Sequence, residues 1–273
     1  MTYKETIHIS KIPGEEIISW QGPNTYKVII DFELDILGDT VPFLIEVVPE
    51  MIKLSEIVPL AYKLSSRISN LIQEKSIKEG ITIPCRKGCS ACCDYLVPLS
   101  IPEAFHLRET VLALPEYTRN KVINSFLDSA KRILRKQAND IESMELDQLS
   151  RWYSKLNLTC PFLSDNSCSI YEKRPIACRE YLVKDTNYFC NPAHGGESQR
   201  IELPASILEC LGKLSSELRH TEIEAVMMPL SIFWTQDNLY SDSETWPSVD
   251  IIRRFTEIIK ESSQINCLAS LAI

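Results

Sequence analysis

The chain has 273 residues, of which 44% are hydrophobic and 24% charged, so it can bury an ordinary globular core without help from disulfides or metals. A formal net charge of −8 argues against nucleic-acid binding, because such binding uses Lys and Arg to displace counterions from phosphates. No apolar run approaches the ~20 residues that cross a bilayer, and the first residues lack the apolar segment of a secretory signal, so we expect a cytoplasmic protein that binds no membrane.

The first predicted elements are strands. From Tyr26 to Ile36 apolar residues alternate with mostly polar ones, which is the period of a half-buried strand. Gly38 and Asp39 favour a turn, and the run from Val41 to Val48 can pair back along the first strand. We therefore expect an N-terminal hairpin or small sheet.

The remaining elements are predicted to be mainly helical. Apolar residues at helical spacing follow Pro59 and predict a helix that stops near Gly80. Ser100 and Glu103 form the pattern of a capping box, with Pro102 in the first turn, and predict a second helix over residues 101–113. Similar periodicity predicts further helices over residues 122–134, 141–155, 203–219 and 248–262.

These elements predict a mainly helical α+β fold. Residues 1–80 would form the hairpin and a helix, residues 81–200 a cysteine-rich metal-binding centre, and residues 201–273 C-terminal helices. We expect the three parts to make one integrated domain.

Ten cysteines in a chain without an export signal indicate metal ligation, because cytosolic reductants keep thiols reduced. Eight of them fall within about a third of the chain and are the candidate metal ligands: Cys85, Cys89, Cys92, Cys93, Cys160, Cys168, Cys178 and Cys190. Cys210 lies in an apolar pattern and, like Cys267, is expected to be a small buried hydrophobe.

The first four candidates form the spacing Cys85-x3-Cys89-x2-Cys92-Cys93. If this segment is helical, all four thiols share one face, but Gly88 disfavours a helix and a loop around a metal satisfies the spacing equally. Cys92 and Cys93 are adjacent and cannot easily reach one metal ion together. One of them can serve a second site, bridge two metals, or remain an unligated thiol.

A second group of cysteines lies after the predicted helices. Turn residues over 164–167 separate two short extended pieces, which would place Cys160 roughly opposite Cys168. Pro175 can open a short helix that carries Cys178. Five cations within the two motifs can offset thiolate charge or donate to sulfur: Arg86, Lys87, Lys173, Arg174 and Arg179.

The stretches CRKGCSACC at residues 85–93 and CPFLSDNSCSIYEKRPIACREY at residues 160–181 closely resemble the YkgJ-type cysteine-cluster family. That family is described as a "putative zinc- or iron-chelating domain", and the resemblance covers roughly residues 81–190. It implies that the cysteines of both motifs bind metal. Flagellin lysine N-methylase belongs to the same family, so methyl transfer from S-adenosylmethionine to a protein lysine is an implied activity.

Two classes of function follow. In the first, the cysteines hold an iron-sulfur cluster or another iron site, for redox chemistry or S-adenosylmethionine-dependent methyl transfer to a protein substrate. In the second, they hold closed four-thiolate zinc sites in a structural module that binds a partner, although paired Cys-x2-Cys knuckles are missing. No other catalytic motif is present, and no catalytic residue is predicted.

Two other patterns have a functional interpretation beside a structural one. Cys85, Cys89 and Cys92 have the three-ligand spacing of radical S-adenosylmethionine enzymes, but Ala91 replaces the usual aromatic residue and strand-helix repeats are lacking. His194 lies four residues after Cys190 and is either a nitrogen ligand or a residue of a solvent-exposed loop.

Overall fold

The computed structural model describes the chain apart from residues 1–16, 20–25, 137–143, 191–193, 195–197 and 272–273. Side chains over 17–19, 146–147 and 266–271 are also outside the description. The described part contains eight α-helices, one three-stranded sheet and three two-stranded sheets. This confirms the mainly helical α+β class, whereas the three-part division of the chain stays a prediction.

The predicted N-terminal hairpin is confirmed. Strands β2 (Val28–Ile36) and β3 (Asp39–Val47) pair antiparallel, and the rings of Phe32 and Phe43 stack across them with centroids 5.1 Å apart. Leu37 and Gly38 both have positive φ, 54° and 85°, as a two-residue hairpin turn requires. The short strand β1 (Ile17–Ser19), which the sequence pattern did not predict, pairs in parallel with β3.

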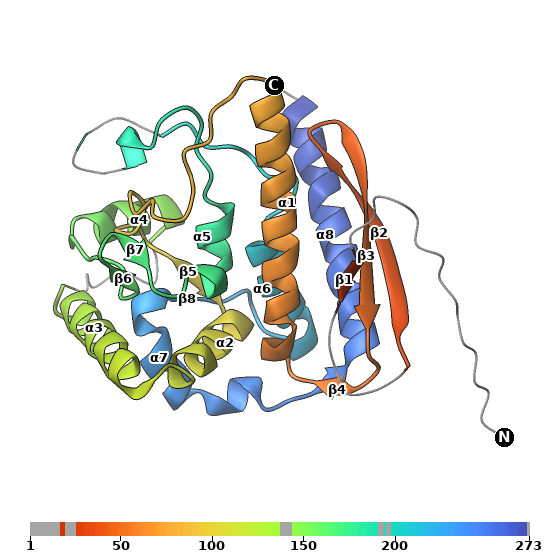
Figure 1. Cartoon of the computed structure of the whole chain (residues 1–273). Helices are drawn as coiled ribbons and strands as arrows, with labels where there is room; N and C mark the ends of the chain where they lie inside the picture. Colours follow the sequence, from red (N-terminus) through yellow and green to blue (C-terminus); the bar gives the residue numbers. More distant parts are fainter. Residues whose placement is uncertain (1–16, 20–25, 137–143, 191–193, 195–197, 272–273) are drawn as a thin grey trace.

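Two long helices, α1 (Val58–Lys78) and α8 (Ser248–Leu271), lie against the sheet (Figure 1). Helix α6 (Ile207–Arg219) packs against both of these helices. One apolar cluster joins buried residues from β2 to α8, including Ile45, Leu64, Leu211 and Phe255. The predicted stop of the first helix is correct, since Gly80 follows α1 with a φ of 81°.

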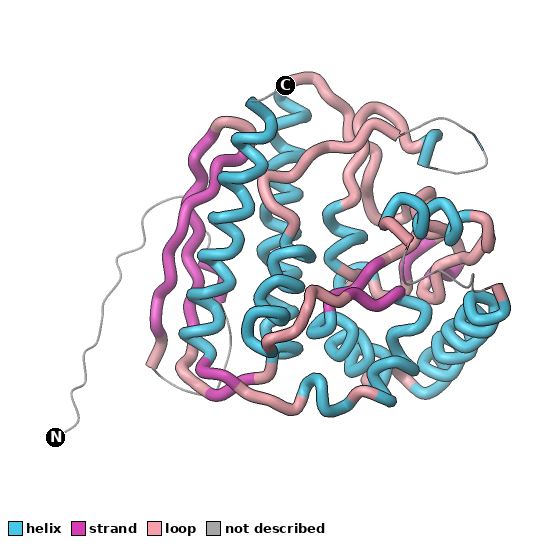
Figure 2. Tube along the Cα trace, turned by 180° about the vertical axis from the view of Figure 1, so that it is seen from behind, coloured by secondary structure: helices cyan, strands magenta, loops and turns pink. Residues whose placement is uncertain are grey.

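A second group of helices lies on the other side of α1. It consists of α2 (Ile101–Leu112), α3 (Glu116–Arg135), α4 (Leu146–Ser154) and α7 (Met228–Asp237) (Figures 1 and 2). The apolar faces of α2, α3 and α7 meet in a second cluster, in which the rings of Phe126 and Phe162 pack edge to face 5.3 Å apart. Tyr153 of α4 packs in a smaller cluster with Ile133 of α3. The beginning of the helix predicted over 141–155 falls on residues outside the described part.

Two short ladders join segments that are distant in the sequence. Strand β5 (Pro98–Ser100) pairs antiparallel with β8 (Ala225–Met227), and β4 (Met51–Ile52) pairs with β9 (Trp246–Pro247). Both ladders join segments more than 100 residues apart, so local sequence patterns did not predict them.

The capping box predicted at the start of α2 is only partly correct. Ser100 is the N-cap, but its hydroxyl makes no cap hydrogen bond and is buried without a partner. Glu103 instead turns toward another part of the chain, where one carboxylate oxygen accepts the N–H of Ile176 at 2.7 Å. Tertiary contacts have therefore replaced half of the local motif.

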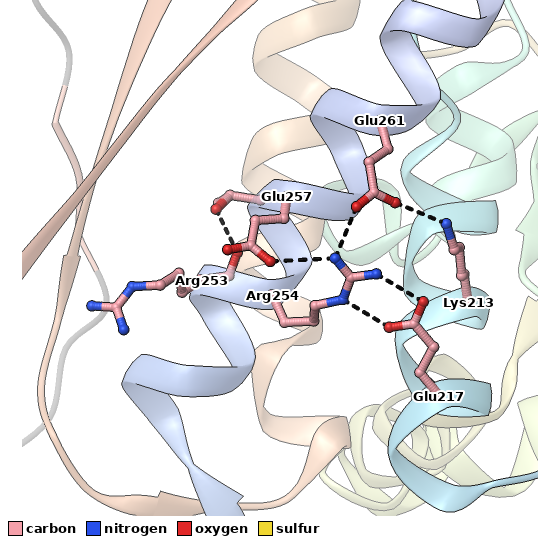
Figure 3. A network of polar contacts seen from close by, with 7 residues as sticks. Lys213, Glu217, Arg253, Arg254, Glu257 and Glu261 are labelled. Carbon is pink, nitrogen blue, oxygen red and sulfur yellow. Dashed lines mark hydrogen bonds and ion pairs between the residues drawn. The ribbon is translucent and has the colours of Figure 1, made fainter.

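Helices α6 and α8 are also joined by ion pairs at their surface. Arg254 donates to both carboxylate oxygens of Glu217 at 2.8 and 2.9 Å, and to Glu261 at 2.9 Å (Figure 3). Glu261 also accepts from Lys213 at 3.0 Å. None of the helices in the described ranges combines the length and apolar character of a membrane span.

Candidate metal centre

The first cysteine motif lies in the segment between α1 and β5, on the side of α1 away from the sheet (Figure 1). It is made of turns, with hydrogen bonds from the N–H of Cys89 to the carbonyl of Arg86 at 2.9 Å and from Cys93 to Ser90 at 3.0 Å. Gly88 has a φ of 89°, in the left-handed region that side chains disfavour. The loop alternative is therefore correct, and a continuous helix over residues 85–93 is excluded.

The second motif begins with a very short hairpin. Strands β6 (Leu163–Ser164) and β7 (Ser167–Cys168) enclose a turn whose two residues have positive φ. The residue opposite Cys168 is Leu163, so the prediction that Cys160 lies there is wrong. Cys160 precedes the ladder because the N–H of Leu163 donates to its carbonyl, which closes a turn before the strand.

A short helix, α5 (Ile176–Glu180), carries Cys178 as predicted. Pro175 is its N-cap, and the Cys178 N–H donates to the Pro175 carbonyl at 3.0 Å. Arg179 is buried beside Cys178 and donates to the carbonyls of Arg174 and Glu172 at 2.9 and 2.7 Å. It also lies over the ring of Tyr62 in α1, 4.4 Å from the centroid, so α5 is fixed to α1.

The two motifs meet directly. The N–H of Cys160 donates to the carbonyl of Cys93 at 2.8 Å. A third segment joins them, because the amide of Asn187 donates to the sulfur of Cys89 at 3.3 Å and the Cys190 N–H donates to the Asn187 carbonyl. The fold thus brings cysteines from three stretches of chain into one region.

All eight candidate ligands are free thiols with restricted access to solvent. Cys190 is buried, and the other seven are half-buried. Cys85 packs against the apolar cluster beneath the sheet, whereas Cys160, Cys168 and Cys178 pack against the second cluster. The donors therefore line the boundary between the two cores.

Burial is the main electrostatic influence on these thiols. Burial, joined by neighbouring thiols, raises the pKa of Cys92, Cys93 and Cys160 to about 12 each. Burial also raises the pKa of Cys178. These four thiols are consequently neutral in the metal-free protein, and a metal must displace their protons to bind.

The described residues contain no group of three or more Cys, His, Asp or Glu side chains that already meets as a metal-binding group. Coordination therefore requires the thiols to turn toward a common centre. The donor chemistry fits the metals in question, because clustered thiolates bind zinc and iron-sulfur clusters, whereas Mg²⁺ and Ca²⁺ prefer oxygen.

Two of the five motif cations act on a thiol. Burial raises the pKa of Cys168, while a backbone hydrogen bond from Ile170 and the charges of Arg174 and Arg179 lower it. Lys87 is exposed, with its ammonium 4.0 Å from Glu172. These positions support charge compensation by the arginines of the second motif.

His194 and His106 each pack against a tyrosine ring. His194 is exposed, stacks on Tyr188 with centroids 4.0 Å apart, and contacts the Tyr188 carbonyl through Nδ1 at 2.8 Å. His194 is therefore a residue of a solvent-exposed loop, the second of the two alternatives given for it. His106 packs edge to face on Tyr62 at 5.6 Å.

The two remaining cysteines, Cys210 and Cys267, lie in the helices α6 and α8. Cys210 is buried in α6 within the first apolar cluster, as expected. The side chain of Cys267 lies outside the described residues, so its expected burial stays a prediction.

Three residues near the thiols were not predicted to lie there. Asn187 donates to the sulfur of Cys89, and Glu103 and Tyr62 surround the base of α5. Asn187 could only have been found from its position three residues before Cys190. The sequence pattern marks Glu103 as a capping residue alone and does not distinguish Tyr62.

Residues 84–195 match the model of the CxxCxxCC family, whose description reads "Putative zinc- or iron-chelating domain". The match confirms the resemblance found in the sequence and supports a metal-binding role. No curated protein and no solved structure matches the chain.

The thiols lie apart from two hollows in the surface of the protein. One hollow of about 430 Å³ is bounded by Arg132 and Trp152, and another of about 270 Å³ lies between the sheet and α1. No cysteine lines either hollow, so the thiols form a separate feature of the surface.

Proposed function

We propose that the protein holds an iron-sulfur cluster, or another iron site, through cysteines supplied by distant segments. The observation that carries the proposal is the hydrogen bond between Cys160 and Cys93, which brings two motifs separated by more than 60 residues to one place. With Cys190 added, this region offers eight thiols. Such a donor set suits soft metals.

Two neighbours of the thiols favour a redox role. The amide of Asn187 donates to the sulfur of Cys89, and Arg179 lies buried next to Cys178. Hydrogen bonds to sulfur and nearby positive charge both raise the reduction potential of a cluster. When bound, the cluster would supply electron transfer, while this chain's residues hold it and limit its contact with water.

Methyl transfer to a protein lysine is a narrower version of this proposal. Its support is the resemblance of the two cysteine motifs to the YkgJ-type family, to which flagellin lysine N-methylase belongs. The measurement is binding of S-adenosylmethionine to the metal-loaded protein by calorimetry. A lack of binding would remove methyl transfer and leave the redox role.

The alternative is a zinc-binding module that presents a surface to a protein partner. It is favoured by the number of thiols, since eight fit two closed four-thiolate zinc sites. Purification without oxygen, followed by measurement of iron, zinc and acid-labile sulfide, separates the two. Iron with sulfide and visible absorption is expected, and a colourless protein with stoichiometric zinc would establish the alternative.

A further inference from the structure

The eight candidate thiols fall into two spatial groups. A single four-coordinate metal or a single cluster with four thiolate ligands would use only half of them. The adjacent pair Cys92-Cys93 lies where the groups meet. The contacts of each cysteine indicate which thiols share a metal.

The first group surrounds residues 183–190. The N–H of Asp185 donates to the carbonyl of Thr82 at 2.7 Å, so this segment runs beside the beginning of the first motif. Asn187 then reaches the sulfur of Cys89, and the short 3₁₀ turn Tyr188–Cys190 brings in the buried Cys190. These contacts place Cys190 with the N-terminal half of the motif.

Cys85 belongs with these two thiols. It packs against the apolar cluster beneath the sheet, whereas Cys160, Cys168 and Cys178 pack against the second cluster. Thr82, which accepts the Asp185 N–H, lies three residues before Cys85. Cys85, Cys89 and Cys190 therefore form the first set of neighbours.

The second group belongs to the other core. Cys160, Cys168 and Cys178 all pack against the cluster that contains Phe162 and Ile170. The N–H of Ser169 donates to the Phe162 carbonyl at 2.9 Å, which holds the segments of Cys160 and Cys168 side by side. These three cysteines form the second set of near neighbours.

The adjacent pair divides between the groups. The carbonyl of Cys93 accepts the N–H of Cys160 at 2.8 Å, which places Cys93 with the second group and completes four thiols there. Two successive thiols cannot easily reach one metal, so Cys92 completes the first group with Cys85, Cys89 and Cys190.

We propose that the eight thiols form two four-cysteine metal sites, and that the neighbouring Cys92 and Cys93 each belong to a different one. Site A consists of Cys85, Cys89, Cys92 and Cys190, and site B consists of Cys93, Cys160, Cys168 and Cys178. The inference rests on the proposed function only in that the cysteines bind metal, and it holds for zinc or for iron-sulfur clusters.

The division explains why adjacent cysteines occur. Two successive residues cannot easily turn both thiols to one metal, but they can serve two metals on either side of the backbone. The pair then links the sites covalently, and the Cys160–Cys93 hydrogen bond holds site B against it. Arg174 and Arg179 offset the charge of site B, to which Cys168 contributes.

The first experiment compares metal content between variants purified without oxygen. Cys89→Ser is expected to keep half of the wild-type metal, Cys168→Ser the other half, and the double variant none. Cys210→Ser is the matched control, since this buried thiol lies in α6, and it should keep all the metal. Loss of all metal from each single variant would overturn the two-site assignment, whereas a metal-free wild type would overturn the proposed function.

A second measurement needs no variant and so does not depend on a substituted protein folding. Metal-free protein is loaded with one equivalent of Zn²⁺, treated with an alkylating reagent, and digested for mass spectrometry. The four most protected thiols should be one complete site, so that Cys92 and Cys93 differ in protection. Equal protection of Cys92 and Cys93 at one equivalent, with both fully protected at two, would contradict the assignment.

Discussion

The backbone N–H of Cys160 lies 2.8 Å from the carbonyl oxygen of Cys93, and this hydrogen bond joins the two cysteine motifs. It is a main-chain contact, so it does not depend on the ionisation of either thiol. The polypeptide itself therefore brings the motifs together, and coordination has only to turn the side chains.

The turn at Gly88 is expected to be sensitive to substitution. A Cβ at this position would meet no atom within 4 Å, but the φ of 89° is strained for any L side chain. Gly88→Ala should lower the free energy of unfolding by about 1 kcal/mol and weaken metal binding at Cys85 and Cys89.

Gly212→Ala is the matched control. Gly212 lies inside α6, where an added Cβ would make an ordinary contact at 3.5 Å with Ile223. Alanine is the better helix former, so this variant should be as stable as wild type or up to about 1 kcal/mol more stable. Urea unfolding of both variants provides the comparison, and equal effects would refute the turn argument.

Arg179 is expected to position Cys178. Arg179→Lys keeps the charge but loses the planar guanidinium that donates to two carbonyls and to Ser66. The free energy of unfolding should therefore fall by about 2 kcal/mol. Metal content should fall as well, because α5 is no longer fixed to α1. Arg86→Lys, at an exposed position of the first motif, should change stability by less than about 0.5 kcal/mol. Equal behaviour of the two variants would argue against a positioning role.

Glu103 should make stability fall as pH rises. Burial raises its pKa from 4.5 to about 7, although the hydrogen bond from Ile176 opposes the change. Between these values the folded state keeps a proton that the unfolded state has lost, so the free energy of unfolding decreases by on the order of 3 kcal/mol. Glu103→Gln can keep the hydrogen bond from Ile176 without titrating, and its stability relative to wild type should improve from pH 5 to pH 8. Parallel pH profiles would contradict this reading.

The ion pair between Arg254 and Glu217 should contribute little and in a salt-dependent way. Glu217→Gln is expected to cost less than about 1 kcal/mol at neutral pH and low salt, and the cost should shrink at high salt. Its hydrogen bonds from Arg254 lower the pKa of Glu217, so the contribution is present above the unfolded pKa and is lost as pH falls. A cost unchanged by salt and by acid would show that packing dominates.

Local patterns predicted the elements better than their contacts. The alternation from Tyr26 to Ile36 and the helical stripe before Gly80 identified β2 and α1, because each pattern is decided by burial along one element. The parallel strand β1 and the register of Cys168 opposite Leu163 depend on partners outside the local pattern.

The same contrast between local patterns and long-range contacts holds for the candidate site. Sulfur chemistry and spacing identified the thiols, since ligand types are recognisable without structure. Asn187, Glu103 and Tyr62 are ordinary residues whose positions follow from tertiary packing, so the sequence could not reveal their place beside the motifs.

The central claim is that the gathered cysteines bind metal, and metal analysis of a double variant tests it most directly. Wild type and Cys89→Ser/Cys178→Ser are purified without oxygen beside Cys210→Ser and Cys267→Ser, and iron and zinc are counted per chain. Stoichiometric metal in wild type and in both single variants, with loss in the double variant, is the predicted result. Equal metal in all four proteins, or none in wild type, would contradict the claim.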